Sequence, residues 1–271
     1  MRILCVLTSE ASVPAALDAA RLAAAAIPGS TIEALDVVVD PTHMVATDEE
    51  VSIQYLREER EGTARQRALS TRAAFDTWKE QPGSEAAPVT WRSITGAETA
   101  GVVNEATADV VLIVVAHDAN MDAADALHAA IFSTGKPVLL VPTDWRPGAR
   151  TKFSHIAVGL IDDDTMRRAI MAAKPWLRDA ERISAISIQG TGNVSLDPAS
   201  MWPVASISPE FVAVPPSSEK TANRLVQEAD RLEADLLVAG AYGHMELMEW
   251  LFGGVTRELL QVADLPLLLA H

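Results

Sequence analysis

Four glycines near the C-terminal end of the chain have the spacing of an anion-binding loop. They are Gly240, Gly243, Gly253 and Gly254. The apolar run 235–239 before them indicates a short buried strand, and a helix is expected over 255–262 after them. A loop that joins a strand to a helix exposes backbone N–H groups at the positive end of the helix dipole. This segment is therefore the first candidate for a binding site.

Several neighbouring residues could complete that site. His244 follows the second glycine and could donate a hydrogen bond to a phosphate or only cap the segment, while Val255 and Thr256 begin the expected helix. Asp162 opens an acidic run over 162–164, which could hold a ribose or a metal or could simply cap a helix. A triphosphate would tolerate three nearby carboxylates only if Mg²⁺ bridged them.

Composition limits the class of protein. The chain has 271 residues, enough for one large domain or two of average size, and a formal net charge of −15. Such a charge argues against general affinity for nucleic acid or anionic membranes. The only cysteine, Cys5, lies in an apolar run and is expected to be a buried thiol. No apolar run is long enough to span a bilayer, and no signal peptide is indicated, so a cytoplasmic protein is expected.

Apolar strands alternate with helical patterns along the whole chain. The expected strands are 2–7, 32–39, 89–94, 110–116, 138–141, 156–160, 182–188, 211–214, 235–239 and 265–270. The expected helices are 13–27, 48–79, 98–106, 122–132, 164–177, 217–232 and 255–262. The mixed charges at 57–61 are typical of a solvated helix face with weak ion pairs, to which no function is given.

The β/α order restarts after the Pro- and Gly-containing segment at 142–148, and parts of the sequence repeat with it. Residues 108–114 parallel 234–238, and 136–140 parallel 265–269. We therefore expect a first domain over 1–142, a linker over 143–153 and a second domain over 154–271. The second copy replaces the long second helix by a loop-like segment at 190–209, and only the second copy has the glycine loop.

Buried strands alternating with helices predict an α/β fold of two tandem doubly wound five-stranded parallel sheets, each in the order 3-2-1-4-5. In that order the crossovers after strands one and four leave toward opposite faces, which opens a crevice at the carboxyl ends. In the second copy, residues 161–164 and 240–256 would form the walls of this crevice.

The pattern Gly240-x2-Gly243-x9-Gly253, followed by Gly254, Val255 and Thr256, resembles the nucleotide-binding motif of the universal stress protein family. The tandem organisation resembles the two-domain members of that family, so the resemblance covers nearly the whole chain. It implies ATP in the crevice, with the triphosphate against the glycine loop. It also implies that the two copies pair through the edge of strand five as an internal pseudo-dimer, and a homodimer of tandem chains stays open.

The sequence departs from the family pattern at two places. Gly254 stands where the motif has Ser or Thr, and Ile161 stands where the family tends to have an aspartate, with Asp162 one residue later. In the first copy, Leu7 or Thr8 occupies the aspartate position. Nucleotide binding is therefore expected in the second copy and not in the first.

The leading hypothesis is a universal-stress-type protein that binds an adenine nucleotide in its second copy as a regulatory ligand in a stress response. A nucleotide-free protein that acts through its dimer and helical surfaces is the alternative, and a slow ATP hydrolase using Mg²⁺ at Asp162 is a third hypothesis. No nucleophile elbow, Walker-type loop or dinucleotide fingerprint is present, so the sequence does not require an enzyme.

Overall fold

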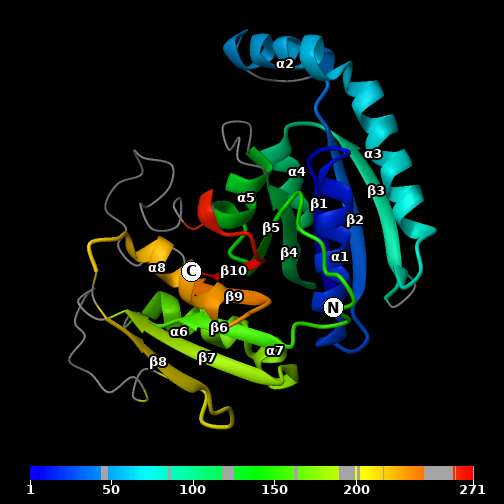
Figure 1. Ribbon diagram of the computed structural model, residues 1–271. Coiled ribbons are helices and arrows are strands. Elements are labelled where there is room, and N and C mark those ends of the chain that lie inside the picture. The colour runs from blue at the N-terminus through cyan, green and yellow to red at the C-terminus, as the bar shows by residue number, and fades with distance from the viewer. Residues whose placement is uncertain are drawn as a thin grey trace.

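The computed structural model shows one ten-stranded sheet with helices on both of its faces (Figure 1). It describes residues 1–43, 48–84, 87–117, 125–161, 164–188, 199, 202–215, 217–240, 259 and 261–270. The strands stand in the order β3-β2-β1-β4-β5-β10-β9-β6-β7-β8. Each half of the chain therefore has the order 3-2-1-4-5, which confirms the predicted fold class.

The strands lie close to the bounds that the apolar runs predict. They are β1 (Arg2–Leu7), β2 (Thr31–Val38), β3 (Val89–Thr95), β4 (Val110–His117), β5 (Val138–Pro142), β6 (His155–Gly159), β7 (Arg182–Ile188), β8 (Glu210–Val214), β9 (Leu236–Gly240) and β10 (Leu267–Ala270). Within each half, all neighbouring strands are parallel.

The helices differ more from expectation than the strands do. They are α1 (Ser12–Ala25), α2 (Asp48–Glu61), α3 (Ala64–Lys79), α4 (Glu98–Glu105), α5 (Asp125–Ser133), α6 (Asp164–Ala172), α7 (Lys174–Asp179) and α8 (Thr221–Arg231), with a short 3₁₀ helix, η1, at Pro41–His43. Among the described residues, no helix combines the length and the apolar character that crossing a bilayer requires.

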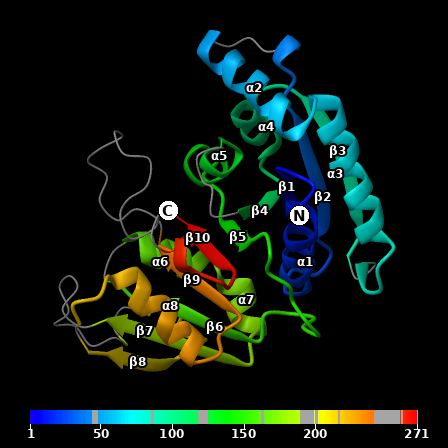
Figure 2. The ribbon, with the colours of Figure 1, turned by 45° about the horizontal axis from the view of Figure 1, so that its top comes forward.

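The two halves join through an antiparallel pair of strands, β5 and β10 (Figure 2). Leu267 is paired with Leu140, and Leu268 with Leu139. All four side chains are at most 1% exposed. The edge of the fifth strand in each half is thus covered by the other half, which is the pairing that the resemblance implied for the two copies.

Side chains that alternate along the strands fill two hydrophobic cores, one on each face of the sheet. Ile3 and Cys5 belong to the core under α1, α3, α6 and α7, whereas Leu4 and Val6 belong to the core under α4, α5 and α8. Each core contains residues of both halves. On the first face, the buried indole N–H of Trp176 in α7 donates to the Ala23 carbonyl of α1 at 2.9 Å, which links the halves a second time.

The long helix expected over 48–79 is two helices, α2 and α3. Gly62 has φ +87, a left-handed conformation that a helix cannot contain. Thr63 then starts α3 with a capping box, in which its hydroxyl accepts from the Gln66 N–H and the Gln66 side chain accepts from the Thr63 N–H. As a result, α2 turns away from the sheet and projects beyond the rest of the first half (Figure 1).

The helix expected over 164–177 is also divided, into α6 and α7. Pro175 lies in the first turn of α7, where its missing N–H is tolerated but cannot continue the hydrogen bonds of α6. The break lets Trp176 turn into the core, where its side chain is nearly fully buried.

The contact between α7 and α1 gives a first prediction. In Trp176→Phe the aromatic ring is largely kept but the N–H donor to Ala23 is lost, and the buried carbonyl then lacks this partner. We expect the free energy of unfolding to fall by about 1–2 kcal/mol, measured by urea denaturation of the full chain. An unchanged midpoint would mean that this hydrogen bond contributes nothing to joining the halves.

Candidate functional site

A cavity of about 630 Å³ opens in the first half, at the carboxyl ends of β1, β2 and β4. This is the place where a doubly wound sheet binds ligands, because the crossovers after β1 and β4 leave toward opposite faces. The helices α2 and α3 form its outer wall, together with the turn between β1 and α1. The size is within the range of small-molecule sites.

The turn after β1 is closed by its own side chains. The buried Ser12 hydroxyl accepts hydrogen bonds from the backbone N–H groups of Thr8 and Ser9, both at 3.1 Å, and donates to the Ser9 carbonyl at 2.6 Å. These two N–H groups are thus already satisfied within the turn. Leu7 ends β1 and Thr8 follows it, so this turn has no aspartate at the position where the family tends to have one.

Arg57 joins α2 to the rest of the cavity wall. Its guanidinium forms ion pairs with Glu61 at 2.7 Å and with Glu98 of α4 at 3.2 Å. The second Glu98 oxygen accepts from the Ala126 N–H at the start of α5, at 3.2 Å. With a side chain only 18% exposed, Arg57 does not lie on a solvated face. The interpretation of the cluster at 57–61 as a solvated face with weak ion pairs is therefore wrong for Arg57, while Glu59, Arg60 and Glu61 are exposed as expected.

The electrostatics of this pair follow from its burial. Burial lowers the pKa of Arg57, but hydrogen bonding and charge from Glu61 and Glu98 outweigh it and raise the pKa above its ordinary value. Burial raises the pKa of Glu98, and the Arg57 charge opposes that rise. The pair places α2 above the cavity, and two carboxylates already offset the charge of Arg57.

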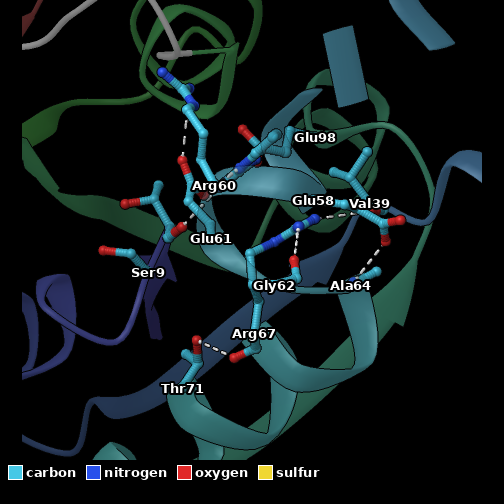
Figure 3. Close-up of polar contacts among 12 residues, drawn as sticks. Ser9, Val39, Glu58, Arg60, Glu61, Gly62, Ala64, Arg67, Thr71 and Glu98 are labelled. Carbon is cyan, nitrogen blue, oxygen red and sulfur yellow. Dashed lines mark hydrogen bonds and ion pairs between the residues drawn. The ribbon is translucent and has the colours of Figure 1, made fainter. Parts of the chain in front are cut away.

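Arg67 of α3 has a different set of partners (Figure 3). It donates to the backbone carbonyl of Gly62 at 2.7 Å and to that of Val39 at 3.2 Å. Among the described residues, no carboxylate forms an ion pair with it. Burial, followed by the positive charge of Arg57, lowers the pKa of the Arg67 guanidinium below its ordinary value. A cation held in this way favours the arrival of an anion.

Asp36 of β2 is a buried acid that also lines the cavity. It is 6% exposed, and one of its oxygens accepts from the Ser93 hydroxyl at 3.1 Å. No cation within the described part of the chain forms an ion pair with it. Burial raises the pKa of Asp36 to about 6, and the hydrogen bond from Ser93 opposes the rise. Perturbed acids in clefts are candidates for ligand contacts.

In the second half, the structure describes the two strands at the corresponding position. The parallel strands β6 and β9 are neighbours, and Gly240 is the last residue of β9. A Cβ on Gly240 would lie 3.0 Å from the Met166 backbone nitrogen, in the first turn of α6. The first glycine of the motif thus allows close approach of β9 to the helix after β6.

The other predicted site residues lie outside the described residues. They are Asp162, Gly243, His244, Gly253, Gly254, Val255 and Thr256. Ile161 is described and is 47% exposed. Asp164, the first residue of α6, has an exposed side chain that accepts from Arg167 at 2.9 Å.

Sequence reasoning missed the cavity of the first half, although two signals for it exist. Asp36 is an acid within the apolar run 32–39 that is expected to form a strand. Gly62, together with the Thr63-x-x-Gln66 capping-box pattern, predicts a turn that brings Arg57 and Arg67 to one place.

Two solved structures resemble the chain over nearly its whole length. A universal stress protein from Archaeoglobus fulgidus DSM 4304 aligns with a TM-score of 0.65 at 12% identity, covering 99% of this chain and 95% of that one. A functionally unknown protein from Pseudomonas aeruginosa PAO1 aligns with a TM-score of 0.56 at 15% identity, covering 99% and 92%. No protein-family model and no curated protein matches the sequence. The chain has the fold of a universal stress protein, and at these identities the likeness is one of fold.

The buried acid gives a prediction with a defined pH dependence. The Asp36 carboxyl has a pKa of about 6 in the folded chain against 3.8 as its ordinary value. Folding is therefore progressively disfavoured as the pH rises through this window, by about 1.4 kcal/mol per unit. Asp36→Asn should match the parent chain near pH 4 and exceed its unfolding free energy by about 2–3 kcal/mol near pH 7.5, measured by urea denaturation.

The control for this experiment is Asp76→Asn on the outer side of α3. Asp76 pairs with Arg72 and its side chain is 51% exposed, so the change should be below about 1 kcal/mol at either pH. A pH-independent effect of Asp36→Asn would contradict the assignment of the penalty to the buried charge.

The contact of Gly240 gives a separate prediction. Gly240→Ala should lower the unfolding free energy by about 1–3 kcal/mol, because the new methyl group meets backbone atoms that cannot rotate away. The matched control is Gly96→Ala, since a Cβ there meets nothing within 4 Å. Equal stability of the two variants would show that β9 does not need this close approach.

Proposed function

We propose that this protein is a universal-stress-type binding protein whose second half binds an adenine nucleotide, ATP, as a regulatory ligand. The observation that carries the proposal is that Gly240, the first glycine of the Gly240-x2-Gly243-x9-Gly253 motif, ends β9 beside the parallel strand β6. Because the sequence contains no recognisable set of catalytic residues, we propose that the nucleotide changes the conformation or the partners of the protein rather than being turned over.

The described part of the crevice supports a ligand at this place. The helix after β6 packs on one face of the sheet, with Met166 and Ile170 in the first core. After β9, Leu259 and Ala263 belong to the second core, on the opposite face. The two connections therefore diverge, which is the condition for a crevice at the carboxyl ends of neighbouring strands.

Within that crevice, we assign the phosphates to the backbone N–H groups of Gly253, Gly254, Val255 and Thr256 at the start of the last helix. Gly243 would let the backbone approach the ligand closely, and His244 would donate a hydrogen bond to a phosphate. Asp162 would contact the ribose or hold Mg²⁺ with the phosphates. Gly254 supplies no hydroxyl where the family motif has Ser or Thr, so the phosphates depend more on backbone donors.

Thermal unfolding tests the proposal. ATP with Mg²⁺ at about 100 times its dissociation constant should stabilise the folded chain by about 2.7 kcal/mol, which raises Tm by several degrees. Gly243→Val should abolish this shift, because the added side chain fills the space of the ligand. Repeating the titration with EDTA shows whether Mg²⁺ takes part.

The control variant is Gly96→Ala, which changes a glycine at the end of β3, far along the sheet from the motif, and should keep the full ATP shift. The absence of any shift in the parent chain at millimolar ATP would sink the proposal. That result would favour the nucleotide-free protein that acts through its surfaces. Phosphate release that disappears in Asp162→Asn would instead support the slow hydrolase.

A further inference from the structure

We propose that the cavity of the first half is a second ligand site, which takes a small hydroxylated organic anion. Arg67 binds the anionic group, Asp36 accepts hydrogen bonds from the hydroxyl groups, and Arg60 attracts the ligand from the outer edge of the cavity. The site is independent of the nucleotide proposed for the second half.

The first step of the argument is that Arg67 is an anion-binding group that is already in place. A guanidinium has five N–H donors, and the described structure gives Arg67 two hydrogen bonds, both to backbone carbonyls. These bonds fix the orientation of the planar group, and no described carboxylate pairs with it directly, although Glu58, Glu61 and Glu98 act on its charge from a distance. The remaining donors suit the two oxygens of a carboxylate or phosphate.

Arg60 adds a second positive charge to the same cavity. Its side chain is 71% exposed, and its contact with Glu61 is a loose one of 3.9 Å. Arg57, by contrast, forms ion pairs with Glu61 and Glu98 and positions α2. In Figure 3, the Arg67 side chain is turned toward Gly62 and Val39, whereas the Arg60 side chain extends away from them.

Asp36 sets the second part of the ligand chemistry. A buried carboxylate without a cationic partner costs stability, and its one hydrogen bond, from Ser93, leaves acceptor capacity on the carboxylate. The groups that such an acceptor can take from a ligand are hydroxyl or amino donors. Since anion-binding and donor-accepting groups line one cavity, the ligand must carry both an anionic group and donors.

The charges around the cavity argue against a triphosphate. Four carboxylates line it beside the three arginines, and a polyanion would be repelled by them. The backbone N–H groups after β1, which could otherwise cradle phosphates, are satisfied by the Ser12 hydroxyl. A singly or doubly charged molecule with several hydroxyl groups is repelled less and can be bound by side chains alone.

Isothermal titration of the full chain with ribose phosphate, glycerophosphate and gluconate tests the proposal. The first two carry a phosphate and the third a carboxylate, so the comparison identifies the anionic group. We expect at least one of them to bind, and Asp36→Asn to weaken it at least about tenfold, as the loss of a charge-assisted hydrogen bond requires. Asp36→Asn is expected to fold more stably than the parent, so weaker binding cannot come from misfolding.

Two further variants test the cationic side. Arg67→Lys keeps the positive charge but loses the planar pair of N–H donors that a carboxylate or phosphate accepts, and should weaken binding about tenfold or more. Arg60→Gln removes an exposed charge and should weaken binding a few-fold. Arg65→Gln is the matched control, because Arg65 is an exposed arginine of α3 that does not line the cavity. It should leave the affinity unchanged.

Four results would overturn the proposal. The first is that none of the three probes binds, and the second is that inorganic phosphate binds as tightly as ribose phosphate. The third is that Asp36→Asn leaves the affinity for the probes unchanged. The fourth is that the Gly243→Val variant still binds ATP and that adding Arg67→Lys abolishes this binding. The first half would then be a nucleotide site. Loss of the ATP shift in Gly243→Val, with ribose phosphate still bound, supports both sites separately.

Discussion

The antiparallel pairing of β5 with β10 is the contact on which the rest of the structure depends. Without it, each half would expose the edge of its fifth strand, and such edges invite pairing with other chains. The pairing strands also bury Val138 and Leu269, in addition to the four leucines, on the two faces of the sheet. Each such side chain contributes roughly 1.5–3 kcal/mol when it is fully removed from water. Because of this contact, the core on each face of the sheet continues from one half of the chain into the other.

A continuous sheet fixes the place of both crevices. In each half the strand next to the fifth is the fourth, and its other neighbour is the first, so the divergence of crossovers recurs on both sides of the antiparallel pair. The halves have thus kept the topology that makes a ligand site. They differ in sequence at this place: the glycine motif that begins at Gly240 follows β9 in the second half, whereas charged side chains of α2 and α3 line the cavity in the first.

Buried charge in the first half has opposite consequences for two groups. Arg57 and Glu98 satisfy each other, and the Ala126 N–H takes the second carboxylate oxygen. A buried pair of this kind is weak evidence for stability, but removal of one member leaves a costly charge. Among the described residues, Asp36 has a hydrogen bond from Ser93 and no ion pair, so its charge is a net cost to the folded chain. A mutually compensated charge pair therefore lies beside an acid whose charge no described cation offsets.

The sequence alone determined the strands and their order in each half. These depend on the alternation of apolar residues and on short-range turn signals, which are local properties of the chain. Only the tertiary structure decided that Arg57 meets Glu98, 41 residues away, and that Ser93 meets Asp36, 57 residues away. Neither contact has a period or spacing in the sequence, because each is set by how the crossovers return the chain to the sheet. The division of the expected helix at Gly62 shows the limit most clearly: a local signal for the turn was present, yet the direction in which α2 leaves and the cavity that it closes are consequences of packing.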